Sequence, residues 1–177
     1  IQLSEELVEG GDVVEFKISP DGIFVAYVAD QDENNLFELY VVPVDKATDE
    51  AAVKVSVPLA GRGIRETAPG SGRYFFDWAP NSSRVTYIAD AADSPPANDF
   101  DNFFELFSST PDGRSKDVVS DLTFQGSDVQ DFEWEPDSTL IAYVADQDTD
   151  EKFELYVSPG DGTGLSQRVS KVPMIGN

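Results

Sequence analysis

The chain has 177 residues and 40% of them are hydrophobic, so it is long enough and apolar enough to bury a core. Its 34 Asp and Glu against 12 Lys and Arg give a formal net charge of −22, which opposes binding to nucleic acid and to anionic membrane surfaces. No apolar run approaches the roughly 20 residues that cross a bilayer, so no membrane insertion is expected. The lack of cysteine excludes disulfides and thiolate metal sites.

Three copies of one sequence pattern follow each other along the chain. The first, FKISPDGIFVAYVADQDENNLFELYV, covers residues 16–41, and the third, FEWEPDSTLIAYVADQDTDEKFELYV, covers 132–157. The second begins as FDWAPNSSRVTYIAD at 76–90 and resumes as FELF at 104–107, after a polar insertion at 91–103. Because the register is kept on both sides of the insertion, the copies predict three units of one structure.

Each copy predicts four short strands. The first strand ends in a turn such as Pro20-Asp21-Gly22, in which Pro fixes φ and Gly permits a positive φ. The second strand (LIAYVA at 140–145) is apolar on both faces, and the third (FELYV at 153–157) follows an acidic loop. A Gly-containing turn then leads to a fourth strand. Repeats of roughly 40 to 50 residues with four strands are typical of β-propeller blades. The fold class expected is all-β, with three consecutive blades of four antiparallel strands.

The repeated pattern resembles the WD-like repeats of the TolB-type β-propellers. It consists of an aromatic residue, a Pro-Asp-Gly turn, an IAYVAD-type strand and ELYV. That family is found in bacterial envelope and secreted proteins, and in the propeller domains of prolyl-oligopeptidase-like peptidases. The second copy departs from the pattern, with Asn81-Ser82-Ser83 in place of Asp-Gly. The resemblance implies the fold and an extracytoplasmic location, periplasmic or secreted, in a bacterium. It implies no single task, because propellers have many functions.

The ends of the chain predict more blades than the sequence contains. Residues 3–13 (LSEELVEGGDV) match 119–129 (VSDLTFQGSDV), so residues 1–12 are expected to be the outer strand of a preceding blade. The other expected divisions are 13–58 for the first blade, 59–72 for an inter-blade connection, 73–122 for the second blade and 123–177 for the third. Propellers close with about four to eight blades, so the chain is expected to be part of a larger ring. A ring built from two copies is the alternative.

The loop after the second strand alternates oxygen-bearing side chains. Its positions are Asp30, Asp32 and Asn34 in the first copy and Asp146, Asp148 and Asp150 in the third. Oxygen ligands at alternating positions suit Ca²⁺, but the Gly at the sixth position and the Glu at the twelfth position of an EF-hand loop are absent. Calcium ligation and a solvated acidic turn therefore both stay open as interpretations.

In a four-stranded blade, the loop between the second and third strands lies on the same side as the connection between blades. The acidic loops should therefore share a side with GRGIRETAPGSGR at 61–73, the most basic stretch of the chain. With the insertion at 91–103 this segment predicts a polar binding surface, although local charge balance would explain the same residues. The candidate partner-binding residues are Arg62, Arg65, Arg73, Asp93, Asp99 and Asp101. The expected partner is a protein, further blades of the propeller, or another copy of the chain.

Catalysis is limited by the residue types that the chain lacks. With no His and no Cys it can form neither a Ser-His-Asp triad nor a Cys-His pair, and it has no nucleophile elbow, P-loop or dinucleotide fingerprint. No catalytic residue and no required cofactor are predicted. The sequence favours a non-catalytic binding or scaffolding module. The alternatives are the propeller that gates access to a hydrolase domain in a prolyl-oligopeptidase-like enzyme, which the resemblance implies, and a calcium-stabilised surface component.

Overall fold

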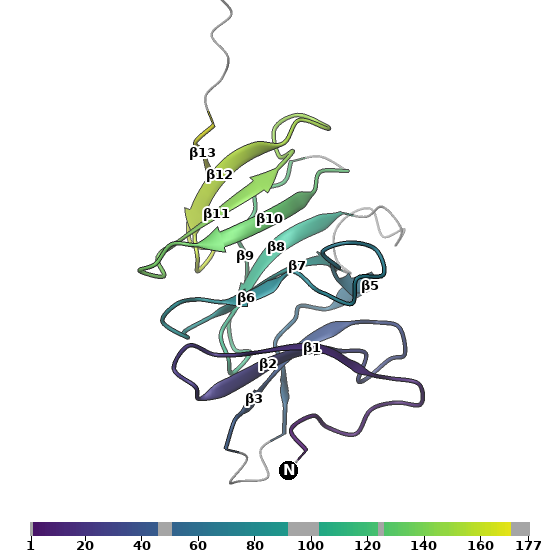
Figure 1. Cartoon of the computed structure of the whole chain (residues 1–177). Helices are drawn as coiled ribbons and strands as arrows, with labels where there is room; N and C mark the ends of the chain where they lie inside the picture. Colours follow the sequence, from purple (N-terminus) through teal and green to yellow (C-terminus); the bar gives the residue numbers. More distant parts are fainter. Residues whose placement is uncertain (1, 46–50, 92–102, 124–125, 171–177) are drawn as a thin grey trace, which may run out of the picture.

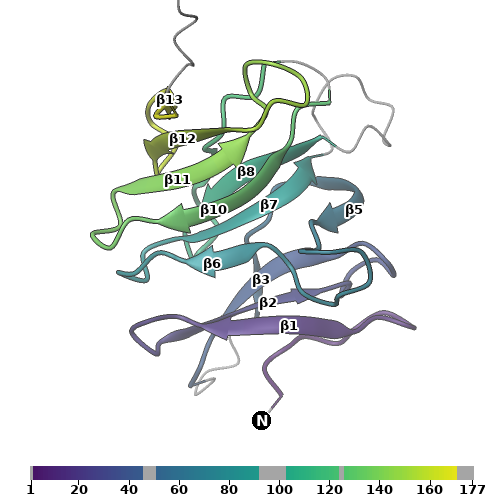
Figure 2. The same ribbon diagram turned by 45° about the horizontal axis from the view of Figure 1, so that its top comes forward.

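The computed structural model of the chain describes residues 2–45, 51–91, 103–123 and 126–170. Over these residues the chain forms three antiparallel β-sheets, stacked one on the next in the order of the sequence (Figures 1 and 2). Each sheet corresponds to one sequence repeat, and we call the sheets the first, second and third blades. Among the described residues there is no helix that is long and apolar enough to cross a membrane.

The first and third blades have the same strand order and the same register. The first consists of β1 (Val13–Ile18), β2 (Phe24–Ala29), β3 (Glu38–Pro43) and β4 (Val53–Lys54), from the inner strand to the outer one. The third consists of β10 (Val129–Trp134), β11 (Leu140–Ala145), β12 (Glu154–Pro159) and β13 (Gln167–Arg168). In both blades a register shift follows the first residue of the inner strand. The repeat in the sequence is therefore also a repeat of backbone geometry.

The second blade divides its inner strand in two. Its strands are β5 (Leu59–Ile64), β6 (Phe76–Trp78), β7 (Val85–Ala91), β8 (Phe104–Ser109) and β9 (Lys116–Val118). Both β5 and β6 pair with β7, through Ile64 opposite Ala89 and Phe76 opposite Tyr87. The first half of the segment expected to be a connection, 59–72, is thus part of the sheet. Residues 65–75 leave the sheet between the two halves, and we call them the 65–75 excursion.

The apolar core lies between the blades. Side chains alternate along the central strands and reach both faces of each sheet, where the neighbouring blade covers them. Between the first and second blades, Ala26, Val28, Leu39 and Val41 pack on Trp78, Val85, Tyr87 and Phe107. Between the second and third, Ile88 and Leu106 pack on Trp134, Ile141, Tyr143 and Tyr156. We call the face of a blade toward the next blade in the sequence its trailing face, and the opposite face its leading face.

Each leading face carries one stacked pair of aromatic rings at the same register. The ring centroids are 5.3 to 5.5 Å apart and the interplanar angles are 18° to 20°. The pairs are Tyr27–Tyr40, Tyr87–Phe107 and Tyr143–Tyr156. The leading faces of the three blades therefore carry the same kind of surface.

Residues 2–12 lie across the leading face of the first blade and form no strand. Leu3 and Leu7 pack on the buried cluster that contains Tyr27, and the N–H of Val8 donates to the carbonyl of Gln31 at 3.1 Å. Residues 2–12 do not extend any of the described sheets. Their assignment to a preceding blade stays a prediction.

The described sheets form an open stack and do not close into a ring (Figure 1). All regular structure in this part of the chain is β-strand, arranged antiparallel in each sheet. The predicted all-β fold of consecutive four-stranded units is confirmed, with the divided inner strand of the second blade as the one departure from four.

Candidate binding site

The acidic loop of the first blade and the basic segment 61–73 meet on one side of the stacked sheets. Phe37, at the end of an acidic loop, forms a parallel bridge with Gly63, and the N–H of Ile64 donates to the carbonyl of Phe37 at 2.8 Å. Gly63 has a φ of +76°, and a Cβ there would lie 2.0 Å from the Phe37 carbonyl oxygen, so only glycine fits. The acidic loops and the basic segment thus share a side, as the sequence predicted. We call it the loop side, and we call the opposite side, with the β1–β2 and β3–β4 turns and their equivalents, the turn side.

The loop side has a pocket of about 450 Å³ between the first and second blades. The 65–75 excursion forms one wall and is tied together by Glu66, whose carboxylate accepts the N–H groups of Gly70 and Gly72 at 2.7 and 3.2 Å. The N–H of Thr67 donates to the carbonyl of Arg73 at 2.8 Å. The wall is therefore a closed, hydrogen-bonded loop. The lining includes Asn35, Phe37, Arg65, Ala68, Tyr74 and Phe104.

Arg65 supplies the positive charge of the pocket and also connects the second blade to the third. Its guanidinium carbon lies 4.8 Å from the centroid of the Phe104 ring, and its Nη1 donates to the carbonyl of Val129. Asp128 lies beside it and accepts the N–H of Phe104 at 3.0 Å. These contacts hold the Arg65 side chain in one place, so the cation is preorganised.

Tyr74 forms the aromatic floor of the same pocket. Its ring lies 5.2 Å from that of Phe37, and its N–H donates to the carboxylate of Glu15 at 2.5 Å. Burial, with a smaller effect of Glu66 and other nearby carboxylates, raises the pKa of the Tyr74 hydroxyl to about 12. At neutral pH the side chain is therefore a neutral phenol that can donate a hydrogen bond.

The structure places two of the six residues predicted to bind a partner. Arg65 lines the pocket, and Arg73 is exposed on the same excursion. Arg62 lies in β5, but its side chain is outside the described part of the chain. Asp93, Asp99 and Asp101 also lie outside the described residues. The sequence did not single out the aromatic lining of the pocket, because aromatic residues at strand ends are equally typical of a core.

The first carboxylate of each acidic loop is buried and bound to backbone N–H groups. Asp30 accepts the N–H of Asp12 at 2.6 Å and that of Asn35 at 2.9 Å, with one bond on each oxygen. In the third blade Asp146 accepts the N–H groups of Asp128 and Glu151 at 2.6 and 3.1 Å. Both carboxylates join the loop to the segment that enters the blade.

The other oxygen-bearing residues of the two acidic loops do not share a common partner. Asp32 is 2.7 Å from Lys54 Nζ, and Asp148 is 3.4 Å from Arg168 Nη1. Asn34 donates to the carbonyl of Glu9 at 3.4 Å, and Asp150 is exposed. Over the described ranges, no three Asp or Glu side chains converge as metal ligands would. Calcium binding at these residues stays a prediction of the sequence.

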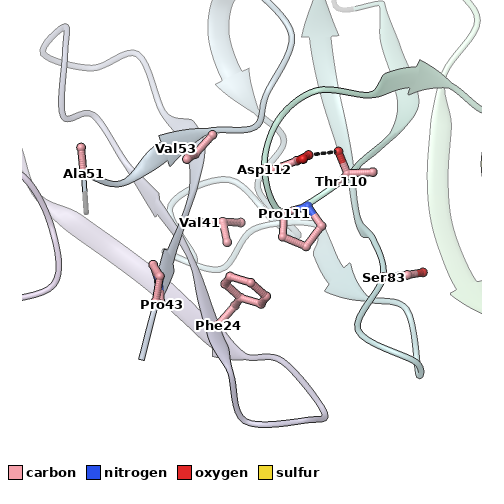
Figure 3. Close-up of a pocket in the computed structure, with 9 residues that line it drawn as sticks. All are labelled: Phe24, Val41, Pro43, Ala51, Val53, Ser83, Thr110, Pro111 and Asp112. Atoms are coloured by element: carbon pink, nitrogen blue, oxygen red, sulfur yellow. Dashed lines mark hydrogen bonds between the residues drawn. The ribbon is translucent and has the colours of Figure 1, made fainter. Parts of the chain in front are cut away.

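The turn side has a second opening between the first and second blades, with a volume of about 570 Å³ (Figure 3). Phe24 lies at its base and stacks on Trp78, with 6.4 Å between the ring centroids. Asp112 lies on the rim and accepts a hydrogen bond from Thr110 Oγ1 at 2.6 Å, which lowers the pKa of its carboxyl. The apolar lining consists mainly of Phe24, Val41, Pro43, Val53 and Pro111. No sequence pattern indicates this groove, because these residues belong to strands and turns of ordinary composition.

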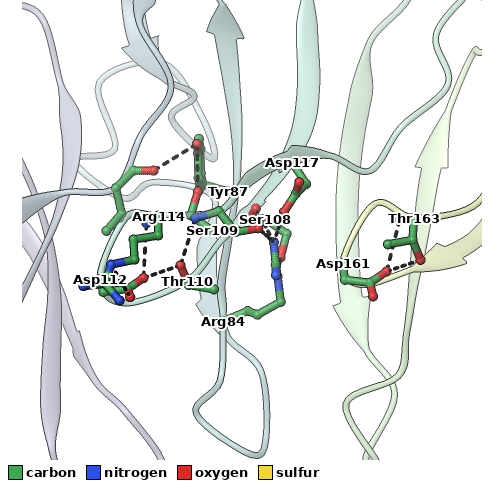
Figure 4. A network of polar contacts seen from close by, with 12 residues as sticks. Arg84, Tyr87, Ser108, Ser109, Thr110, Asp112, Arg114, Asp117, Asp161 and Thr163 are labelled. Carbon is green, nitrogen blue, oxygen red and sulfur yellow. Dashed lines mark hydrogen bonds and ion pairs between the residues drawn. The ribbon is translucent and has the colours of Figure 1, made fainter.

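The corresponding space between the second and third blades is polar. Arg84 takes the position of Phe24 and donates from Nε to Ser108 Oγ at 2.8 Å and from Nη2 to Ser108 O at 2.9 Å (Figure 4). It also forms an ion pair with Asp117. The two inter-blade spaces therefore differ in chemistry although the backbones around them repeat.

A stack of four- and five-stranded antiparallel sheets that pack face to face and do not close into a ring is part of a β-propeller. The solved structures that it resembles include a TolB protein from Agrobacterium tumefaciens, with a TM-score of 0.55 and 18% identity over 89% of this chain and 46% of that one. A prolyl endopeptidase matches with a TM-score of 0.58 and 14% identity over 92% and 22% of the two chains. Prolyl oligopeptidase B from Galerina marginata matches with a TM-score of 0.56 and 17% identity over 92% and 23%.

These similarities confirm the resemblance to TolB-like propellers at the level of the fold. The chain spans less than half the length of each of these proteins, as a partial propeller would. No model of a known protein family and no curated protein sequence matches the chain.

Proposed function

We propose that this chain is a non-catalytic propeller module that binds a protein partner through its loop side. The observation that carries the proposal is the pocket beside the 65–75 excursion, which is lined both by Tyr74 and by Arg65, a cation anchored over the Phe104 ring. An aromatic floor beside a fixed cation suits a peptide segment that carries an apolar side chain and an acceptor group. Loops on a rigid scaffold are also the usual place for such contacts.

The proposal of a non-catalytic module is supported by the residue types of the chain. It has no His and no Cys, so nucleophilic catalysis by a triad or a thiolate would need groups from elsewhere. The extracytoplasmic location that we propose rests on the likeness of the fold to TolB. Its test is whether the full reading frame carries an export signal.

The second candidate is the propeller of a prolyl-oligopeptidase-like hydrolase, because solved structures of such enzymes match over most of this chain. In that case the full reading frame would encode a hydrolase domain joined to these blades. Further blades without a hydrolase segment would favour the binding module instead.

The binding proposal is tested by selecting peptides from a displayed random library on the immobilised chain. Ala68→Glu places a bulky charge at an exposed position in the pocket lining, so it should weaken the selected peptides at least about 10-fold, which is 1.4 kcal/mol. Ser83→Glu, an equally exposed position on the turn side, is the matched control and should leave the Kd unchanged. Selected peptides that bind the Ala68→Glu variant as tightly as the parent would contradict the proposal.

A further inference from the structure

The polar space between the second and third blades opens on the turn side as a pocket of about 450 Å³. Arg84 lines it from the second blade, and Thr139, Gly160 and Asp161 line it from the third. Figure 4 shows Arg84 and Asp161 on the two sides of this space. We call it the Arg84 pocket. It lies on the side of the stack opposite the pocket with the 65–75 excursion.

Two hydroxyl groups beneath the Arg84 pocket have no hydrogen-bond partner among the described residues. They are Thr86 Oγ1 and Ser158 Oγ, and the exposed fractions of the two residues are 0% and 1%. Thr86 is two residues along β7 from Arg84, and Ser158 is two residues along β12 from Gly160. Alternation therefore places both hydroxyls on the faces that form the pocket, one row further in. Buried hydroxyls without a partner are rare, and a ligand or an ordered water usually satisfies them.

Arg84 brings a fixed cation to the pocket. Its Nε and Nη2 donate to Ser108, and Nη2 also bonds to Ser115 and pairs with Asp117. In the part of the chain that the structure describes, Nη1 of this side chain has no acceptor. The guanidinium group is thus held by one edge and keeps N–H groups for a ligand.

Asp161 brings the opposite charge from the third blade. Its Oδ1 accepts the N–H and the hydroxyl of Thr163 at 3.1 and 2.7 Å. These bonds, and to a smaller extent the charge of Arg84, keep the pKa of the Asp161 carboxyl below its usual value, so it is ionised at neutral pH. Arg84 pairs with Asp117 rather than with Asp161. The two opposite charges therefore stand apart on the two walls of the pocket.

The same positions are apolar at the interface between the first and second blades. Phe24 stands where the second blade has Arg84, and Ala26 stands where it has Thr86. Phe24 forms the base of the apolar opening there and stacks on Trp78. The cation and the unpartnered hydroxyl of the second blade therefore belong to one interface and are not part of the general packing of blades, which favours a role in binding.

We propose that the Arg84 pocket binds a small zwitterion, such as a free α-amino acid. The carboxylate of the ligand is directed inward, toward Nη1 of Arg84 and the hydroxyls of Thr86 and Ser158, and its ammonium group lies at the rim against Oδ2 of Asp161. A neutral polyol would use neither charge, and a simple anion would be repelled by Asp161 and by the net charge of −22. This site is separate from the peptide site proposed on the loop side.

The test is an amide ¹H–¹⁵N NMR titration of the whole chain with glycine, acetate, methylammonium and glycerol at constant ionic strength. Glycine should shift the signals of Thr86, Ser158, Gly160 and Asp161 to saturation. Acetate lacks the ammonium group and should bind about 3-fold more weakly. Methylammonium lacks the carboxylate and should bind at least about 10-fold more weakly. If no probe shifts these signals, or if glycerol binds as tightly as glycine, the proposal is overturned in favour of water or of a polyol.

Matched substitutions assign the contacts. Asp161→Asn removes the charge but keeps an acceptor, so it should weaken glycine binding about 3-fold and leave acetate binding no weaker. Asp112→Asn is the control and should change neither, because Asp112 occupies the same position of the second blade, accepts equivalent bonds in its own turn and lines the other opening. Thr86→Val keeps the side-chain shape and should also weaken glycine binding. Folded Asp161→Asn and Thr86→Val variants that bind glycine like the parent would contradict the site.

Discussion

The backbone N–H of Asp12 donates to Oδ1 of Asp30 at 2.6 Å, and the same bond, at the same length, joins Asp128 to Asp146. Each pair links the segment that enters a blade to the loop that follows its second strand. The aspartate that follows YVA in both copies therefore has a structural role, which is to accept backbone hydrogen bonds. It recurs because each of these loops must be held against the segment entering its blade.

Replacing Asp30 or Asp146 by Asn should destabilise the fold. The amide keeps one acceptor but turns an NH₂ toward a backbone N–H, so one buried donor loses its partner at a cost of about 1 to 3 kcal/mol in the free energy of unfolding. Urea denaturation measures the change. Asp150→Asn, at an exposed position, is the control and should stay within about 0.5 kcal/mol of the parent. Equal effects at Asp146 and Asp150 would argue against the backbone role.

Calcium is expected to leave the melting temperature of the described fold unchanged. The carboxylates of Asp30 and Asp146 already accept two N–H groups each, while Asp32 and Asp148 lie beside cations. A thermal melt in EDTA, repeated in millimolar Ca²⁺, checks this. A rise of several degrees on adding Ca²⁺, reversed by the chelator, would establish the calcium site that the alternating oxygens predict.

Arg84→Met should cost about 1 to 3 kcal/mol in the free energy of unfolding. The change removes the bonds to Ser108 and the ion pair with Asp117 in the half-buried space between the second and third blades, so buried oxygens of Ser108 lose the donor that Arg84 supplies. Arg114→Met is a suitable control, because Arg114 is exposed and its ion pair with Asp112 is a surface one. If both variants unfold at the same urea concentration, the Arg84 network contributes nothing.

The stability contributed by Glu154 should depend on pH in the acidic range. The hydrogen bond from Lys152 and then that from Arg168 hold the pKa of this carboxyl below its usual 4.5, against the opposing effect of burial. A pKa that is lower in the folded chain means stability that is present above pH 4.5 and lost as the pH falls through the folded value. The difference in unfolding free energy between the parent and Glu154→Gln should therefore shrink on acidification from pH 7. A difference that stays constant to pH 3 would rule out the linkage.

Much of the fold could be predicted from the sequence, because three copies of one pattern, the first and third of them nearly identical, fix the strands relative to one another. The short apolar run LIAYVA and the recurring prolines locate strands and turns without any long-range information. The divided inner strand of the second blade could not be predicted in this way. After Leu59–Ile64 has paired with β7, 11 residues (65–75) intervene before Phe76–Trp78 pairs with the same strand, and no local pattern shows that a chain returns in this way.

The candidate site could also be predicted only in part, because some of its contacts depend on tertiary packing. The shared side of the acidic loops and the basic segment follows from the order of four strands, so Arg65 and Arg73 could be placed there. The contribution of Tyr74 and Phe37 depends on the excursion that brings their rings within 5.2 Å. Such a contact comes from tertiary packing and leaves no periodic signal in the sequence.

The central claim is that three blades are stacked face to face and that, over residues 2–170 as far as the structure describes them, no blade packs on the trailing face of the third. Urea denaturation of Leu39→Ala, Leu106→Ala and Leu155→Ala tests it most directly, because the three leucines occupy one position of the repeat. The first two variants should lose about 2 to 5 kcal/mol, as buried leucines do, and Leu155→Ala should lose less than about 1 kcal/mol. A loss at Leu155 as large as that at Leu39 would contradict the account.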